Sequence, residues 1–285
     1  MLRVDMILVG VDGSRTGLEA AAWAGAEAAL RRTPLTVAHV VARWVCEDES
    51  SRYAEVGRWL REGGATVLAA AEERVRRENP YVEVRTELLP GDPRAALIEA
   101  AADAELLVVG SRGIGGIRGL LVGSVAHGVA AHARTDVVLV PARPAGAAGA
   151  RGEIVAGVDG SPDGLRALDF ALAEAGRRGV PLRAVHGWAW PQVTGFGPAD
   201  PDSEQDVLRE LRTLVAERRE RHPGVAVVTE VVHGHPVEVL KEAAAGADLL
   251  VVGSRGHTYF AGLVLGSVSQ ALLHHAPCPL AVVRR

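Results

Sequence analysis

The chain has 285 residues, of which 48% are hydrophobic and 23% are charged, and its formal net charge is −4. This length allows one large or two ordinary domains, and the apolar content is ample for packed cores. The negative balance argues against a general nucleic-acid binder, because no basic excess is present to neutralise a run of phosphates.

Signals for export, membrane insertion or a structural metal are missing from the sequence. The N-terminus enters a strand pattern directly, and no apolar run reaches the roughly 18 residues of a membrane-spanning helix. Cys46 and Cys278 are the two cysteines, and they occupy unrelated positions without a CxxC motif. We therefore expect a soluble cytoplasmic protein without a membrane contact, a disulfide framework or a zinc site.

Apolar runs alternate with helix-forming stretches along residues 1–143. The run from Ile7 to Val11 predicts a strand buried on both faces, and Ser14 predicts the N-cap of an Ala-rich helix over about 16–32. The later elements predicted are a strand at 35–41, an irregular stretch with helical bias at 44–64, a helix at about 65–77, a half-buried strand at 82–88, a helix at about 93–102, a strand at 106–109, a helix at about 124–133 and a strand at 137–140.

The same pattern restarts after a linker of small residues at 143–150. Ile154 to Ser161 repeats Ile7 to Ser14, so the chain is a tandem duplication with domains at 1–143 and 152–285. The predicted second-half elements after this strand are helices at 207–221, 237–245 and 267–275 and strands at 182–186, 225–232, 248–252 and 279–283.

Strands that alternate with helices predict parallel sheets built from right-handed crossovers. The expected fold class is α/β, with two Rossmann-like, doubly wound domains, each a five-stranded parallel sheet of order 3-2-1-4-5. Ligands in such sheets bind beyond the carboxyl ends of the strands, where the strand order reverses. In the first domain this crevice lies between Asp12 and Gly110, and in the second between Asp159 and Gly253.

A glycine motif follows the fourth strand of each half. In the first half, Gly110 and Gly113 are followed by nine residues and then Gly123-Ser124 at the start of a helix. Glycines allow close approach of the backbone to phosphate, and free N–H groups at a helix start attract anions. Beside it, an aspartate at the tip of the first strand suits a ribose or a base edge, so the pair of features favours a nucleotide.

Both halves resemble the universal stress protein family in its tandem form, over nearly the whole chain. The likeness is carried by Gly-Val-Asp-Gly-Ser after the first strand, by His39-Val40, and by the Gly-x2-Gly-x9-Gly-Ser motif. The resemblance implies ATP, with Mg²⁺ as a candidate companion ion. It assigns the contacts to Gly10, Asp12, Val40, Gly110, Gly113, Gly123, Ser124 and Val125 in the first half, and to Gly157, Asp159, Gly253, Gly256, Gly266, Ser267 and Val268 in the second.

The resemblance also implies roles for single residues. Asp12 would contact adenosine, Val40 would meet the base through its backbone, and Ser124 would donate its hydroxyl and N–H to phosphate. Gly187 stands at the Val40 position of the second half, which keeps the backbone contact but removes side-chain packing on the base.

The arginines of the glycine loops are further candidates. Arg112 and Arg255 are either surface residues, interface partners or phosphate ligands. Arg118 is a candidate donor to the outer phosphates. Because Ala261 occupies the corresponding position in the second loop, we expect tighter polyphosphate binding in the first half.

Several features have simpler structural interpretations. Asp12 and Asp159 would also serve as turn or helix-capping residues. His39 and His186, which end strands beside the crevice, are expected to be buried and hydrogen-bonded rather than acid–base catalysts. The other histidine pairs lack carboxylate or cysteine partners at ligand spacing, so we predict no metal site.

The leading functional hypothesis is a non-catalytic, ATP-binding regulatory switch in stress response or growth arrest, acting through an unidentified protein partner. The alternative is a slow ATPase or ATP-using transferase, but the loops contain no carboxylate, lysine or evident base. An electron-transfer or AMP-binding module has no supporting motif. The resemblance further implies pairing of the two last strands with each other, and a homodimer.

Overall fold

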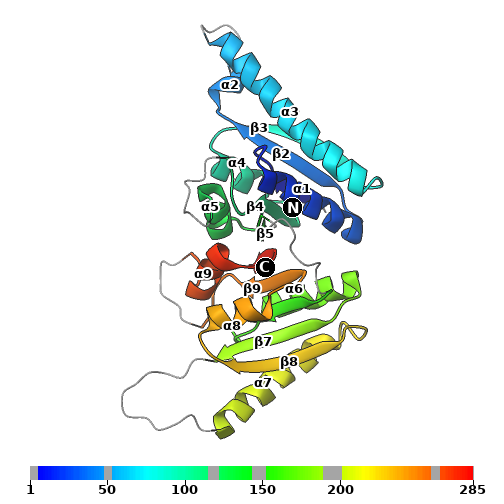
Figure 1. Ribbon diagram of the computed structural model, residues 1–285, viewed down its shortest axis with the longest axis vertical. Helices are drawn as coiled ribbons and strands as arrows, with labels where there is room; N and C mark the ends of the chain where they lie inside the picture. The colour runs from blue at the N-terminus through cyan, green and yellow to red at the C-terminus, as the bar shows by residue number, and fades with distance from the viewer. Residues whose placement is uncertain are drawn as a thin grey trace. The chain divides into compact units, whose positions relative to one another are not determined.

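The structure is a computed structural model that describes residues 6–47, 53–114, 122–142, 152–188, 201–257 and 264–284. The chain forms two compact units, Met1–Pro144 and Ala145–Arg285. Figure 1 shows that each unit consists of strands flanked by helices. Within the described residues, every helix is too short or too polar to cross a lipid bilayer.

The first unit alternates strands and helices, as expected from the apolar pattern. Its strands are mainly apolar except β3, which is largely exposed, and each helix except α2 and α3 follows the predicted bounds to within about two residues. Its elements are β1 (Ile7–Gly10), α1 (Arg15–Arg31), β2 (Leu35–Val41), α2 (Trp44–Glu47), α3 (Ala54–Glu78), β3 (Val84–Pro90), α4 (Pro93–Ala100), β4 (Leu106–Gly110), α5 (Ser124–His132) and β5 (Asp136–Val140).

The first sheet has the order β3-β2-β1-β4-β5, with parallel neighbours. Helices α1 and α3 pack together, as do α4 and α5, and the two pairs cover opposite faces of the sheet (Figure 1). Gly10 lies beside Ala38 on one side and beside Val109 on the other, so the strand ends meet at one edge. The predicted doubly wound fold is confirmed.

The second unit repeats this arrangement in the order β8-β7-β6-β9-β10. Gly157, at the end of its first strand, lies beside Val185. Its elements are β6 (Ile154–Gly157), α6 (Pro162–Arg178), β7 (Leu182–Trp188), α7 (Pro201–Arg219), β8 (Val227–His233), α8 (Pro236–Ala243), β9 (Leu249–Gly253), α9 (Ser267–His275) and β10 (Leu280–Val283).

Two helices begin earlier than the sequence pattern predicted. Helix α3 begins at Ala54 rather than near residue 65, and α7 begins at Pro201 rather than at 207. Glycines in the first half of α3 lower its intrinsic helix propensity, which hid the helix from a propensity-based assignment. Tertiary packing outweighs this cost, because a Cβ at Gly64 would lie 2.7 Å from Leu88 and the glycine therefore lets α3 approach β3 closely.

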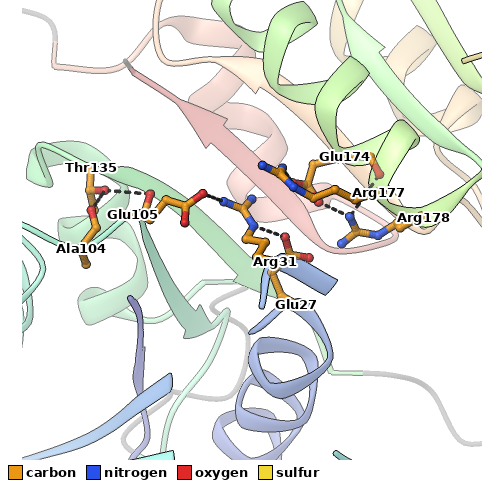
Figure 2. Close-up of polar contacts among 8 residues, drawn as sticks. All are labelled: Glu27, Arg31, Ala104, Glu105, Thr135, Glu174, Arg177 and Arg178. Carbon is orange, nitrogen blue, oxygen red and sulfur yellow. Dashed lines mark hydrogen bonds and ion pairs between the residues drawn. The ribbon is translucent and has the colours of Figure 1, made fainter. Parts of the chain in front are cut away.

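Each unit buries a glutamate from its first helix against arginine (Figure 2). The Glu27 side chain is fully buried and pairs with Arg31 one turn later. At the corresponding position of the second unit, Glu174 is equally buried and pairs with Arg177 and Arg178. A buried carboxylate carries a large desolvation cost, so these arginines are needed for the helices to pack with the charge inside.

Candidate functional site

A cavity of about 420 Å³ lies beyond the carboxyl ends of β1 and β4 in the first unit. Its position is where the strand order reverses, as the doubly wound topology predicts. The described residues of the predicted first site all line it: Gly10, Asp12, Val40, Gly110, Arg112, Gly113, Gly123, Ser124 and Val125. Arg118, the remaining member of that prediction, lies outside the described residues.

Asp12 connects the tip of β1 to the glycine loop. Its Oδ1 accepts hydrogen bonds from Ser14 N at 3.0 Å and from Ser14 Oγ at 2.5 Å, and its Oδ2 accepts one from Ile114 N at 2.8 Å. The structural interpretation of Asp12 as a turn residue is therefore correct. A carboxylate has about four acceptor positions, so these three bonds leave capacity for one further donor.

Helix α1 and the glycine loop are in direct contact. A Cβ at Gly110 would lie 2.9 Å from both the carbonyl carbon and the carbonyl oxygen of Thr16, so only glycine fits there. The Thr16 hydroxyl donates to the carbonyl of Arg112 at 2.5 Å. Helix α1 therefore fixes the position of the loop, and Gly110, Arg112 and Gly113 of the loop line the cavity.

The start of α5 differs from the starts of α1 and α4. Ser14 and Asp92 cap those two helices with side-chain hydrogen bonds, whereas the N-cap of α5 is Gly123, which has no side chain to do so. Gly123 and Ser124 both line the cavity. The N–H groups in the first turn of α5 and the Ser124 hydroxyl are thus placed to receive an anion.

A second cavity, of about 230 Å³, lies at the corresponding edge of the second sheet. Every residue of the predicted second site lines it: Gly157, Asp159, Gly187, Gly253, Arg255, Gly256, Gly266, Ser267 and Val268. Helix α9 begins, like α5, on a glycine N-cap without a side-chain hydrogen bond. The two units therefore repeat the same set of candidate ligand-binding groups.

Ile114 in the first unit and His257 in the second follow the second glycine of their motifs, and they make different contacts with the aspartate at the tip of the first strand. Asp159 Oδ1 accepts from Ser161 N at 3.0 Å and from Ser161 Oγ at 2.6 Å, as Asp12 does from Ser14. His257, which replaces Ile114, places its ring Nε2 2.6 Å from the backbone oxygen of Asp159. Since a carbonyl only accepts, Nε2 is the protonated nitrogen of this imidazole.

The strand-end histidines are hydrogen-bonded, as predicted, but they are half-buried rather than buried. His39 Nδ1 lies 2.8 Å from the carbonyl oxygen of Val11, and His186 Nδ1 lies 2.7 Å from that of Val158. Each carbonyl accepts, so each Nδ1 donates and the ring links the second strand of its unit to the residue following the first. This bond gives both histidines a structural role beside the cavity.

Beyond the predicted valines, the apolar part of the cavity lining was not predicted from the sequence. Ala38, Pro93 and Leu97 line the first cavity, and Val185 and Leu240 are among their counterparts in the second. These residues carry no chemical signature, and only their place beside the strand tips identifies them. The repeat of Pro93-x3-Leu97 at 236–240 is the one sequence signal that would have pointed to them.

The described residues contain no group of three or more histidine, cysteine, aspartate or glutamate side chains that would hold a metal ion. Asp12 and Asp159 are the carboxylates of the described cavity linings. A protein-held magnesium ion generally needs at least one or two carboxylates free to bind it. The described residues do not fit such a site.

The fold and the cavities define a tandem, doubly wound α/β protein with one opening at the strand-order reversal of each unit. The sequence pattern of the universal stress protein family matches residues 4–141 and 151–284, which together cover nearly the whole chain. The chain belongs to this family.

Relatives of known family align with this chain over nearly its whole length. Universal stress protein Rv2005c of Mycobacterium tuberculosis is 35% identical, over 98% of this chain and 97% of the relative. A universal stress protein of Mycolicibacterium smegmatis is 36% identical, over 98% and 96% respectively. The crystal structure of a universal stress protein from Archaeoglobus fulgidus aligns over 100% of both chains with a TM-score of 0.74 at 19% identity, which shows the common fold.

Proposed function

We propose that this universal stress protein binds ATP in the cavity of the first unit and acts as a nucleotide-dependent regulatory switch in stress response or growth arrest. The base would lie near the tips of β1 and β2, and the phosphates would lie between Gly110–Gly113 and the start of α5. The observation that carries the proposal is a nucleotide-sized cavity that is lined both by Asp12 and by an uncapped, serine-bearing helix start.

The chemistry of the lining fits the two ends of ATP. Ala38, Val40 and Leu97 form an apolar region suited to a purine, and the hydroxyl of Ser124 and the first N–H groups of α5 are suited to phosphate oxygens. Asp12 has one acceptor position left for a ribose hydroxyl or an amino group. Magnesium, if bound with the nucleotide, would be held by phosphate oxygens and water rather than by a cage of protein ligands.

A regulatory role suits the lining better than catalysis. Hydrolysis of ATP requires a positioned water and usually a carboxylate that holds Mg²⁺ near the phosphates. Asp12, the carboxylate of the described first lining, is committed to Ser14 and to the loop through three hydrogen bonds. We therefore propose slow or absent turnover, so that bound ATP persists long enough to act as a signal.

The experiment begins with denaturation of the purified protein and identification of released nucleotide. ATP binding is then measured for the wild type, for Ser124→Ala and for Thr66→Ala, a control that removes an exposed hydroxyl from α3. Loss of a hydrogen bond to a charged group costs about 1.5–3 kcal/mol, so Ser124→Ala should weaken binding roughly tenfold or more. A wild-type protein that neither carries nor binds ATP would refute the proposal.

A phosphate-release assay separates the regulatory role from enzymatic turnover. The wild type should release phosphate from saturating ATP at a rate far below the typical enzyme turnover of about 10 per second. Turnover in that range, abolished by Ser124→Ala, would favour the alternative of an ATP-using enzyme.

We also propose that the protein forms a homodimer and engages a protein partner through its nucleotide state. The mass of one copy is 29.9 kDa, so light scattering should give twice this value for the dimer. A mass near 29.9 kDa both with and without ATP would exclude the dimer.

A further inference from the structure

The two cavities differ in size although much of their lining is repeated. A Cβ at Gly10 would lie 2.8 Å from Leu97 Cδ1, and a Cβ at Gly157 would lie 2.8 Å from Leu240 Cδ1. In both units, therefore, a glycine lets a leucine from the neighbouring helix lie over the first strand. This shared arrangement does not explain why one cavity measures about 420 Å³ and the other about 230 Å³.

The first difference lies on the second strand of each sheet. Ala38 of β2 is replaced by Val185 of β7, at the position that pairs with the terminal glycine of the first strand. Both side chains are buried and both line their cavities. The two additional methyl groups of the valine therefore occupy space that is open in the first unit.

The second difference lies two residues later. A Cβ at Gly187 would lie 2.7 Å from Pro236 Cα, a distance that real side chains do not adopt, so α8 begins almost in contact with the backbone of β7. In the first unit the corresponding residues are Val40 and Pro93, which both line the larger cavity. Because Val40 has a side chain, α4 must begin farther from β2 than α8 does from β7.

We infer that the two units have different ligand specificities: the first cavity admits a complete purine nucleotide, and the second excludes it at the base end. The specificity-determining residues are Val185, Gly187 and Pro236. Small-molecule sites generally measure roughly 300–1,000 Å³, a range that includes the first cavity and not the second. The inference rests on the proposed ATP site. Arg118 is expected to strengthen phosphate binding in the first unit, and the residues named here would in addition exclude the base from the second.

The test uses the full-length protein, calorimetric ATP titration, and two substitutions. The wild type should bind one ATP per chain. Ala38→Val introduces the residue of the second unit into the first cavity and should weaken ATP binding at least tenfold. Ala102→Val, the same change at an exposed position after α4, is the control and should leave the affinity within twofold of the wild type.

Ala38→Val is expected to fold, because valine favours strands and the second unit accommodates it at the equivalent position. Circular dichroism and the melting temperature check this directly.

The wild-type stoichiometry is a second test that needs no variant. Two ATP molecules per chain with equal affinity would overturn the inference and leave the proposed function standing, as would a folded Ala38→Val variant with wild-type affinity. A wild type that binds no ATP would overturn both.

Discussion

The two units of this protein have the same sheet order, the same glycine motif and the same uncapped glycine start of the helix that follows it, yet their cavities differ nearly twofold in volume. The groups placed to bind phosphate are repeated almost without change. The groups that would surround a base are not: Ala38 and Val40 on β2 correspond to Val185 and Gly187 on β7. Substitutions at the tip of one strand can therefore change the size of the ligand that the cavity admits, while the scaffold is preserved.

The largest effects should come from the buried glutamates that both scaffolds share, because Glu27 and Glu174 are fully buried and pair with different sets of arginines. Glu27→Gln leaves Arg31 with its second carboxylate partner, Glu105 (Figure 2). Glu174→Gln removes the carboxylate that both Arg177 and Arg178 contact. Breaking a buried pair typically costs about 3–5 kcal/mol, and we expect Glu174→Gln to lie at the upper end and Glu27→Gln below it.

Urea unfolding measures both free energies. The matched control is Glu72→Gln, which removes an ion pair at the surface of α3 and should cost less than about 1 kcal/mol. Equal losses for Glu27→Gln and Glu174→Gln would contradict the distinction between the two charge clusters.

A smaller effect is expected at the glycines that end β4 and β9. A Cβ at Gly253 would lie 2.6 Å from the carbonyl carbon of Asp163, and a Cβ at Gly110 would lie 2.9 Å from that of Thr16. The backbone of a packed helix does not move aside as a flexible side chain does. Gly→Ala should therefore cost about 1–3 kcal/mol at both sites, with the larger loss at Gly253.

Gly63→Ala provides the matched control for these two variants. Nothing lies within 4 Å of a Cβ at Gly63 in α3, so this change should stabilise the protein by up to about 1 kcal/mol through helix propensity. Denaturation midpoints for all three variants give the comparison. A Gly253→Ala variant as stable as the wild type would show that the helix and the loop have room to separate.

The helix caps should show that the two scaffolds are alike. Ser14 Oγ accepts a hydrogen bond from Gly17 N at 3.1 Å, and Ser161 Oγ accepts one from Gly164 N at 3.1 Å. Ser→Ala should therefore cost about 1 kcal/mol in each unit, and Ser→Thr, which retains the hydroxyl, should cost less. Thermal unfolding tests this equality, and a loss confined to one unit would argue against it.

The smallest effect concerns reactivity rather than stability. Burial raises the pKa of the Cys278 thiol to about 12, whereas Cys46 is exposed. At pH 8 only about one Cys278 side chain in ten thousand would be the reactive thiolate. A thiol reagent should modify Cys46 rapidly and Cys278 only after unfolding. Rapid modification of two thiols per folded molecule would contradict this burial.

The sequence by itself determined much of the organisation. Short apolar strands that end in glycine or aspartate, with serines as helix caps, depend on local chemistry that recurs along the chain, so the duplication, the strand order and the position of the crevice were predictable. The resemblance to the universal stress protein family, carried by the same motifs, assigned the described members of the candidate sites, which line two cavities in the fold. Local signals also predicted the hydrogen-bonded histidines at the strand ends.

Only the tertiary structure decided the start of α3 and the size of each cavity. Helix α3 extends back to Ala54 because packing against β2 and β3 outweighs its glycines, and no local signal reports such packing. The second cavity is small because Pro236 lies against Gly187, residues brought together by the fold and not by the sequence. Distances between elements that are remote in sequence depend on how side chains fill the space between them, and a single sequence does not encode them in any local pattern.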